Sequence, residues 1–176
     1  MEKKRVLMVI SQENFRDEEL LHPSEVFRQK GFEVVVAAGE KKEALGSYGA
    51  KVTPDMTIDE AGKQSFDAVV IVGGNGSRIH LWGNQTLFNL VRAHHATGRP
   101  LGAICIAPVV LAQAGLLKGV DATMYKSADT SEEFAKHGVK TSEKDVVVSG
   151  SIVTGNGPAA ARKFGAAVAS LVEPEK

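Results

Sequence analysis

The chain contains only one cysteine, Cys105, among its 176 residues. This scarcity excludes an internal disulfide and any metal site built from several thiolates. The five histidines show no metal-ligand spacing, so we expect neither a metal nor another cofactor. Two roles are open to Cys105: a small apolar side chain in the core, or a reactive thiol.

The chain also lacks a net charge, because 21 basic residues balance 21 acidic ones. This balance argues against a nucleic acid or an anionic membrane surface as a partner. The apolar run after Met1–Arg5 is too short for a signal peptide or a membrane span, which predicts a reducing, cytoplasmic location. A hydrophobic content of 43% and a charged content of 24% are ordinary for a globular protein, and the length predicts one domain over residues 1–176.

Apolar runs alternate with helical patterns along the chain. Buried strands are expected at residues 6–10, 34–38, 66–72 and 101–105, with shorter ones at 121–125, 145–149 and 152–154. Helices are expected at residues 17–30, 84–97, 106–114, 131–137 and 158–171. Pro23 predicts a kink or a late start in the first helix, and residues 40–55 suggest a small hairpin around Gly46 and Gly49. This alternation predicts an α/β fold with a mainly parallel central sheet.

Cys105 lies where an apolar strand is followed at once by a helical pattern. Gly102, Ala103 and Ala107 are small, so the strand and the helix can approach closely around the turn. Such a turn is a nucleophile elbow, which exposes a side chain at the C-terminal edge of a sheet. The partial positive charge of the helix N-terminus favours a thiolate, so this position predicts a reactive thiol.

Gly73 and Gly74 begin a glycine-rich loop at the end of another predicted strand. No Lys-Ser/Thr pair follows, which argues against a phosphate-binding loop. Glycines let main-chain N–H groups turn toward a carbonyl oxygen, so we interpret the loop as an oxyanion pocket beside the thiol. A plain tight turn is the alternative.

Acidic residues fill the first turn of the first predicted helix, and Glu19 is one of them. A carboxyl placed over the thiol can hydrogen-bond to a thiolate or move protons. An acidic first turn also suits the helix dipole, so spacing does not single out Glu19. His22 shares its helical face, and His80 follows the glycine loop, where it can line the mouth of a site or a subunit contact. We expect His94 and His95 to face solvent.

Four motifs occur together in order: FRDEEL at residues 15–20, GG at 73–74, AICIAP at 103–108 and GNGP at 155–158. In this combination the chain resembles the ThiJ/PfpI superfamily, which includes intracellular protease I, the parkinsonism-associated deglycase and glutathione-independent glyoxalases. The resemblance covers nearly the whole chain. It implies a flavodoxin-like three-layer sandwich and a homodimer or an assembly of dimers.

Carried over by position, the resemblance implies that Cys105 is the nucleophile and Glu19 the buried carboxylic acid beside it. It also implies that main-chain N–H groups of Gly74 and Ile106 hold an oxyanion, and that Tyr125 lines the pocket. Further candidates lie in the same motifs: Gly73, Asn156 and Gly157.

The chain departs from the family around the thiol. Ile106 stands where the protease branch has a histidine, and Arg16 and Arg78 stand at positions where acidic residues occur. The leading hypothesis is therefore a cofactor-independent, cysteine-dependent enzyme acting on small reactive carbonyls such as methylglyoxal. The alternatives are a thiol redox sensor, a peptidase or amidase that uses His22 or His80 as its base, and a small-molecule binding module.

Overall fold

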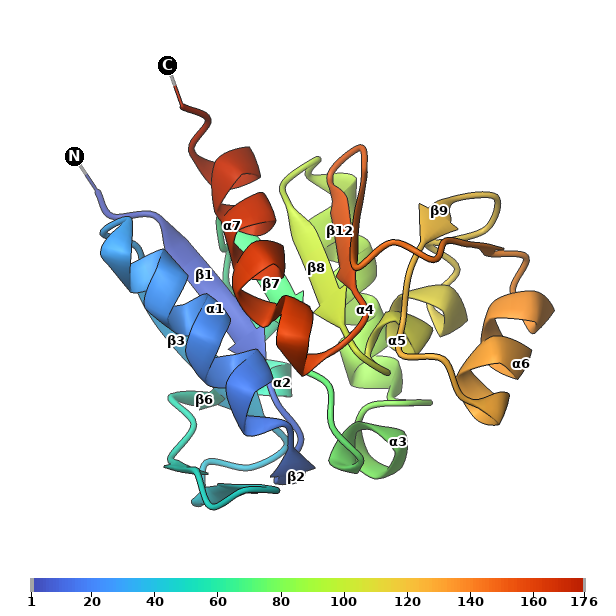
Figure 1. The fold of residues 1–176 in the computed structure, drawn as a ribbon. Coiled ribbons are helices and arrows are strands. Elements are labelled where there is room, and N and C mark those ends of the chain that lie inside the picture. Colours follow the sequence, from blue (N-terminus) through green and yellow to red (C-terminus); the bar gives the residue numbers. More distant parts are fainter. Residues whose placement is uncertain (1, 176) are drawn as a thin grey trace.

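A seven-stranded sheet forms the middle of the molecule (Figure 1), and the computed structural model describes residues 2–175. The strands run in the order β11-β12-β8-β7-β1-β3-β6. Their bounds are β1 Arg5–Val9, β3 Glu33–Ala38, β6 Met56–Thr57, β7 Ala68–Ile71, β8 Leu101–Ile104, β11 Val146–Ser149 and β12 Ile152–Gly155. Every neighbouring pair is parallel except β11 with β12. The order β3-β1-β7-β8-β12 is that of a flavodoxin-like sheet, which confirms the predicted fold class.

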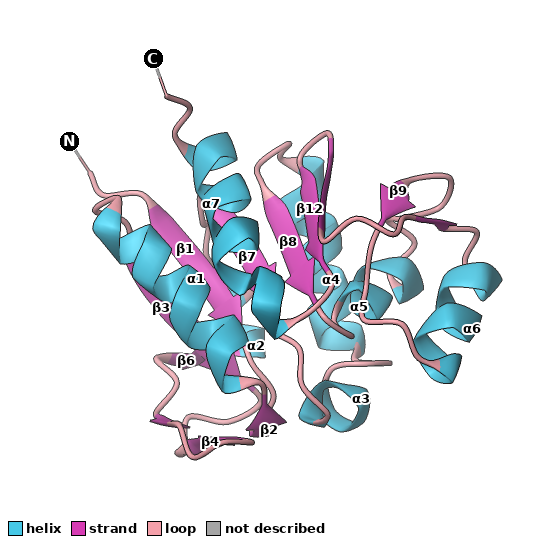
Figure 2. Ribbon diagram, viewed as in Figure 1, coloured by secondary structure: helices cyan, strands magenta, loops and turns pink. Residues whose placement is uncertain are grey.

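Helices cover both faces of this sheet, which makes three layers (Figures 1 and 2). One face carries α1 (Asp17–Gln29) and α7 (Ala161–Val172), and α7 follows a short 3-10 turn at Pro158–Ala160. The other face carries α2 (Ile58–Ala61), α4 (Gln85–Ala96) and α5 (Pro108–Gln113), with α6 (Ala128–Lys136) beside α5. Among residues 2–175, every helix is too short or too polar to span a bilayer.

Alternating side chains of the strands supply the two cores between these layers. In β1, Leu7 and Val9 join the cluster under α4 and α5, whereas Val6 and Met8 join the cluster under α1 and α7. All four are fully buried. Because both sheet faces are covered, these strands read as continuous apolar runs.

Small elements at the edges were not foreseen from the sequence. They are β2 (Glu13–Phe15), β6, α2, α3 (Gly76–His80) and β10 (Lys140–Thr141). The expected hairpin near Gly46 and Gly49 is present as β4 (Ala44–Gly46) and β5 (Lys51–Val52). The strand expected at 121–125 is only β9 (Asp121–Ala122), which pairs with β10. Elements of two to five residues carry too few periods for a hydrophobic pattern to reveal them.

Helix α1 runs through Pro23 without interruption, and Pro23 packs against Gly165 of α7. A Cβ atom added at Gly165 lies 2.9 Å from Pro23 Cα and 3.2 Å from its Cβ. We therefore expect Gly165→Ala to destabilise the protein by about 1–2 kcal/mol, because this overpacking exceeds the gain in helix propensity. Denaturant unfolding measures the change.

The matched control for this prediction is Gly62→Ala. Gly62 has φ −63°, and a Cβ atom there meets only Asp59 O at 3.4 Å and Ile58 O at 3.7 Å. We expect this variant to be neutral or to gain up to about 1 kcal/mol, since alanine restricts the unfolded chain. Equal effects of the two substitutions would contradict the packing argument.

Candidate active site

Three loops meet at the carboxyl edge of the sheet, after β1, β7 and β8. Gly73, from the loop after β7, touches the other two: a Cβ atom added there lies 2.5 Å from Glu19 Oε1 and 2.7 Å from Cys105 Cβ. The lack of a side chain at Gly73 is therefore what lets the carboxyl and the thiol approach each other. This position next to the switch in strand order is where ligands bind in such sheets.

Cys105 occupies the sharp turn that the sequence predicts, between β8 and α5. Its φ of +65° lies in the left-handed region, which non-glycine residues rarely adopt. Two main-chain hydrogen bonds hold it there: its N–H donates to Gly155 O at 2.9 Å, and its carbonyl accepts from Tyr125 N at 2.8 Å. Such strained backbone is typical of functional positions and turns the thiol toward the pocket.

Glu19, on the first turn of α1, has no exposed surface. Within residues 2–175 neither of its carboxyl oxygens has a hydrogen-bond partner of regular geometry. Burial raises the pKa of Glu19 to about 8, while the nearby Cys105 thiol, the charge of Arg16 and the Gly73 N–H lower it. A carboxyl with this pKa is largely protonated at neutral pH and can both give and take a proton.

The main chain at the start of the elbow helix favours a thiolate at Cys105, as expected, but burial opposes it. Burial, followed by the charge of Glu19 and the hydrogen bond to it, raises the pKa of Cys105 to about 12. Main-chain N–H groups of Gly74 and Ile106 act in the opposite direction but are weaker. Desolvation therefore outweighs the short helix α5, and a thiolate needs Glu19 in its protonated form.

A pocket of about 280 Å³ opens over the thiol. The predicted residues Cys105, Ile106, Gly74 and Tyr125 line it. Arg16 and Arg78, at which the sequence departs from the family, also line it, as does Pro158 of the GNGP motif. The remaining lining residues were not expected from the sequence: Ser47 and Tyr48 of the hairpin, and Asn75 just before α3. Tyr48 lies between Gly46 and Gly49, so the predicted hairpin was the one feature of the sequence that could have pointed to Tyr48 as a pocket residue.

Other candidates from the sequence lie outside this pocket. His22 is half-buried on α1, and His80 is exposed on α3; neither lines the pocket. Asn156 donates to Asp145 Oδ1 at 3.2 Å and borders a separate depression. Gly157 is adjacent to the pocket, since a Cβ atom there lies 3.8 Å from Tyr125 Cδ2.

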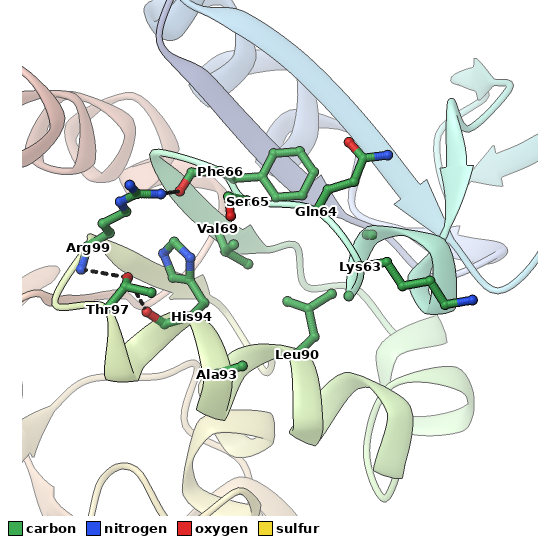
Figure 3. Close-up of a pocket in the computed structure, with 12 residues that line it drawn as sticks. Lys63, Gln64, Ser65, Phe66, Val69, Leu90, Ala93, His94, Thr97 and Arg99 are labelled. Carbon is green, nitrogen blue, oxygen red and sulfur yellow. Dashed lines mark hydrogen bonds between the residues drawn. The ribbon is translucent and has the colours of Figure 1, made fainter.

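A second cavity, of about 290 Å³, lies at the amino edge of the sheet between α2, β7 and α4 (Figure 3). His94 lines it and is 8% exposed, with Nε2 bonded to Pro100 O at 2.8 Å, so the expected solvent-facing position is wrong. Arg99 donates to Phe66 O, and Lys63 extends away from the cavity in Figure 3. Within residues 2–175, no group of three His, Cys, Asp or Glu side chains is arranged to hold a metal ion.

The fold and the site together define a flavodoxin-like α/β protein with a cysteine on a nucleophile elbow and a buried carboxyl beside it. The model of the DJ-1/PfpI family matches residues 4–171. The chain belongs to this family, which confirms the resemblance noted in the sequence.

Individual relatives agree with this assignment. The uncharacterized protein MJ0967 of Methanocaldococcus jannaschii is 42% identical over 173 residues, covering 98% of this chain and 84% of that protein. Deglycase PfpI of Pyrococcus furiosus is 33% identical over 153 residues, covering 86% of this chain and 90% of that protein. The crystal structure of a ThiJ/PfpI domain protein from Brachyspira murdochii superposes with a TM-score of 0.91 at 28% identity, covering 99% of this chain and 100% of that one.

Proposed function

We propose that this protein is a cysteine-dependent enzyme that converts small 2-oxoaldehydes such as methylglyoxal into 2-hydroxy acids without a cofactor. The observation that carries the proposal is the buried pair of Cys105 and Glu19, with main-chain N–H groups of Gly74 and Ile106 directed at the sulfur. An aldehyde is a better electrophile than an amide, so this pair needs no histidine to assist it.

The reaction starts in molecules whose Glu19 is ionised: its carboxylate takes the proton of Cys105 as the sulfur attacks the aldehyde carbon. The N–H groups of Gly74 and Ile106 stabilise the oxygen that becomes negative, and Glu19 then passes the proton to this oxygen, which completes the hemithioacetal. A pKa of about 8 lets Glu19 exchange protons in both directions near neutral pH.

Glu19 next moves the proton of the former aldehyde carbon to the neighbouring ketone carbon by way of an enediol, while the proton of the hemithioacetal hydroxyl passes to the ketone oxygen. The first carbon is thereby oxidised to a thioester and the second is reduced to an alcohol, so no external oxidant is needed. Water then cleaves the thioester and restores the thiol. The overall change adds one water to R–CO–CHO and yields R–CHOH–COO⁻ and one proton.

The relatives support an enzymatic role, because Deglycase PfpI and further proteins named as deglycases match at 29–33% identity. The pocket lining counts against a peptidase. Ile106 follows the thiol, and neither His22 nor His80 lines the pocket to replace a histidine there. The pocket therefore lacks the imidazole that takes the proton of a peptidase cysteine.

We also propose that the chain forms a homodimer or an assembly of dimers in the cytoplasm. Two elements that line the thiol pocket expose large apolar side chains: Tyr48 of the hairpin is 69% exposed, and Ile79, next to Arg78 on α3, is 76% exposed. Exposed apolar groups of this size favour contact with another protein surface. A reducing compartment suits the free thiol of Cys105.

Purified protein is expected to convert methylglyoxal to lactate without added thiol, metal or nucleotide. Proton NMR of the reaction mixture identifies lactate directly and shows whether the dicarbonyl disappears by another route. Loss of methylglyoxal without lactate would indicate mere adduct formation. No consumption at all would contradict the proposal and favour the redox sensor instead.

A further inference from the structure

Two guanidinium groups line the thiol pocket: that of Arg16, from the β2–α1 loop, and that of Arg78, from α3. Their charges reach the reacting pair: Arg16 lowers the pKa of Glu19, and Cys105 raises the pKa of Arg78. Methylglyoxal is uncharged, so its binding does not require two cations in the pocket.

Arg78 is held in one orientation by three partners. Its Nε donates to Asp129 Oδ2 at 2.5 Å, its Nη2 to Asp129 Oδ1 at 3.1 Å, and its Nη1 to Asn75 Oδ1 at 2.8 Å. The guanidinium also lies over the ring of Trp82, 5.5 Å from its centroid. Three of the five N–H groups are thereby used, and the other two remain available to a ligand.

The guanidinium of Arg16 is fixed in a similar way. Its Nε donates to Glu18 Oε2 at 2.9 Å, and its guanidinium lies 4.5 Å from the centroid of the Tyr48 ring. Tyr48 lines the same pocket. Packing against Tyr48 and pairing with Glu18 limit the motion of the guanidinium, so little entropy is lost when its remaining N–H groups bind an anion.

The acidic partners of Arg16 and Arg78 do not stop these guanidinium groups from attracting an anion into the pocket. Glu18 and Asp129 bind the guanidinium groups, but neither carboxylate lines the pocket, whereas both arginines do. Arg78 keeps the pKa of Asp129 low, at about 2, so this ion pair persists at any physiological pH. The surface that a substrate meets therefore presents N–H donors of cations and no carboxylate oxygen, apart from the buried Glu19.

We propose that Arg16 and Arg78 make the pocket selective for 2-oxoaldehydes that carry a carboxylate at their far end. This inference rests on the proposed function for its chemistry. The aldehyde carbon lies at Cys105, and the carboxylate accepts hydrogen bonds from the guanidinium groups, for which their planar forks are suited. The reaction is unchanged: one water is added, the aldehyde carbon is oxidised and the ketone carbon is reduced.

The test compares 4,5-dioxopentanoate with 2-oxopentanal, two five-carbon 2-oxoaldehydes that differ at the far end by a carboxylate in place of a methyl group. We expect wild-type kcat/KM to be at least about tenfold higher for 4,5-dioxopentanoate, mainly through KM. The preference should shrink as salt concentration rises, since screening weakens the attraction. A ratio near or below one overturns the inference while leaving the proposed function intact.

Variants locate the source of the preference. Arg78→Gln and Arg16→Gln are each expected to lower the ratio several-fold, and Arg78→Lys to retain part of it because the charge remains. Because the ratio compares two substrates on the same protein sample, a lower amount of folded enzyme does not change it. Arg28→Gln removes the same charge at the exposed far end of α1 and should leave the ratio unchanged. Equal ratios in all variants would overturn the assignment.

A binding experiment keeps the two proposals separable if neither aldehyde is turned over. NMR titration with 4-oxopentanoate, which has the ketone and the carboxylate but no aldehyde, is compared with 2-pentanone. Tighter binding of 4-oxopentanoate that Arg78→Gln abolishes would support the anion site while the proposed reaction fails. Equal weak binding of both compounds would overturn the anion site as well.

Discussion

Replacing Cys105 by alanine is expected to lower lactate formation from methylglyoxal by at least about 1,000-fold, because the proposed reaction begins with a bond to its sulfur. Hydrogen-bond donors at Gly74 and Ile106 and the carboxyl of Glu19 remain, but without the thiol no hemithioacetal forms. Activity of Cys105→Ala within tenfold of the wild type would contradict the mechanism.

The same substitution is expected to leave the fold intact. Cys105 is only half-buried, its backbone is held by Gly155 and Tyr125, and alanine has the same difficulty as cysteine at a φ of +65°. Circular dichroism and thermal unfolding check this. Cys105→Ser is the matched variant: it keeps the shape of the side chain, but its hydroxyl is a far weaker nucleophile at neutral pH, so it should be inactive too.

Replacing Glu19 by glutamine is expected to stabilise the protein increasingly as pH rises. Glu19 has no exposed surface, and burial raises its pKa from 4.5 to about 8. The folded state therefore holds a proton that the unfolded state has released between those two values. This proton stabilises the folded state fully below pH 4.5, and the stabilisation is lost as pH rises through about 8.

The size of the effect follows from the same pKa. At 1.36 kcal/mol per unit, the advantage of Glu19→Gln over the wild type should grow by about 3 kcal/mol between pH 5 and pH 8. Urea unfolding of both proteins at the two pH values measures it. The difference between pH values separates ionisation from any change in packing that the amide introduces.

A carboxylate that does not act on Glu19 provides the control. The hydrogen bond from Lys41 lowers the pKa of Glu60, so the stabilisation from the ionised Glu60 is already complete well above pH 4.5. Glu60→Gln should therefore change stability by the same amount at pH 6 and at pH 8. A flat pH dependence for Glu19→Gln as well would show that Glu19 is ionised in the folded protein and that burial does not raise its pKa.

The main elements of the fold were predictable because their patterns are long. β1, β3, β7 and β8 are covered on both faces and so appear as unbroken apolar runs, and α1, α4 and α7 show helical spacing over three turns. Short elements such as α3 carry no such signal, although α3 supplies Arg78 to the pocket.

By itself, the sequence determined the parallel α/β architecture and the elbow at Cys105, since both depend on residues close together in the chain. Residue spacing left open which of three adjacent acidic residues meets the thiol; the resemblance pointed to Glu19, and the structure places it there. Only the tertiary structure decided that His22, His80 and Asn156 lie outside the pocket and that two arginines line it. The ionisation of the pair was also beyond the sequence. A helix N-terminus can be recognised from local residues, but the desolvation that raises the pKa of both Cys105 and Glu19 arises from layers packed around them by distant segments.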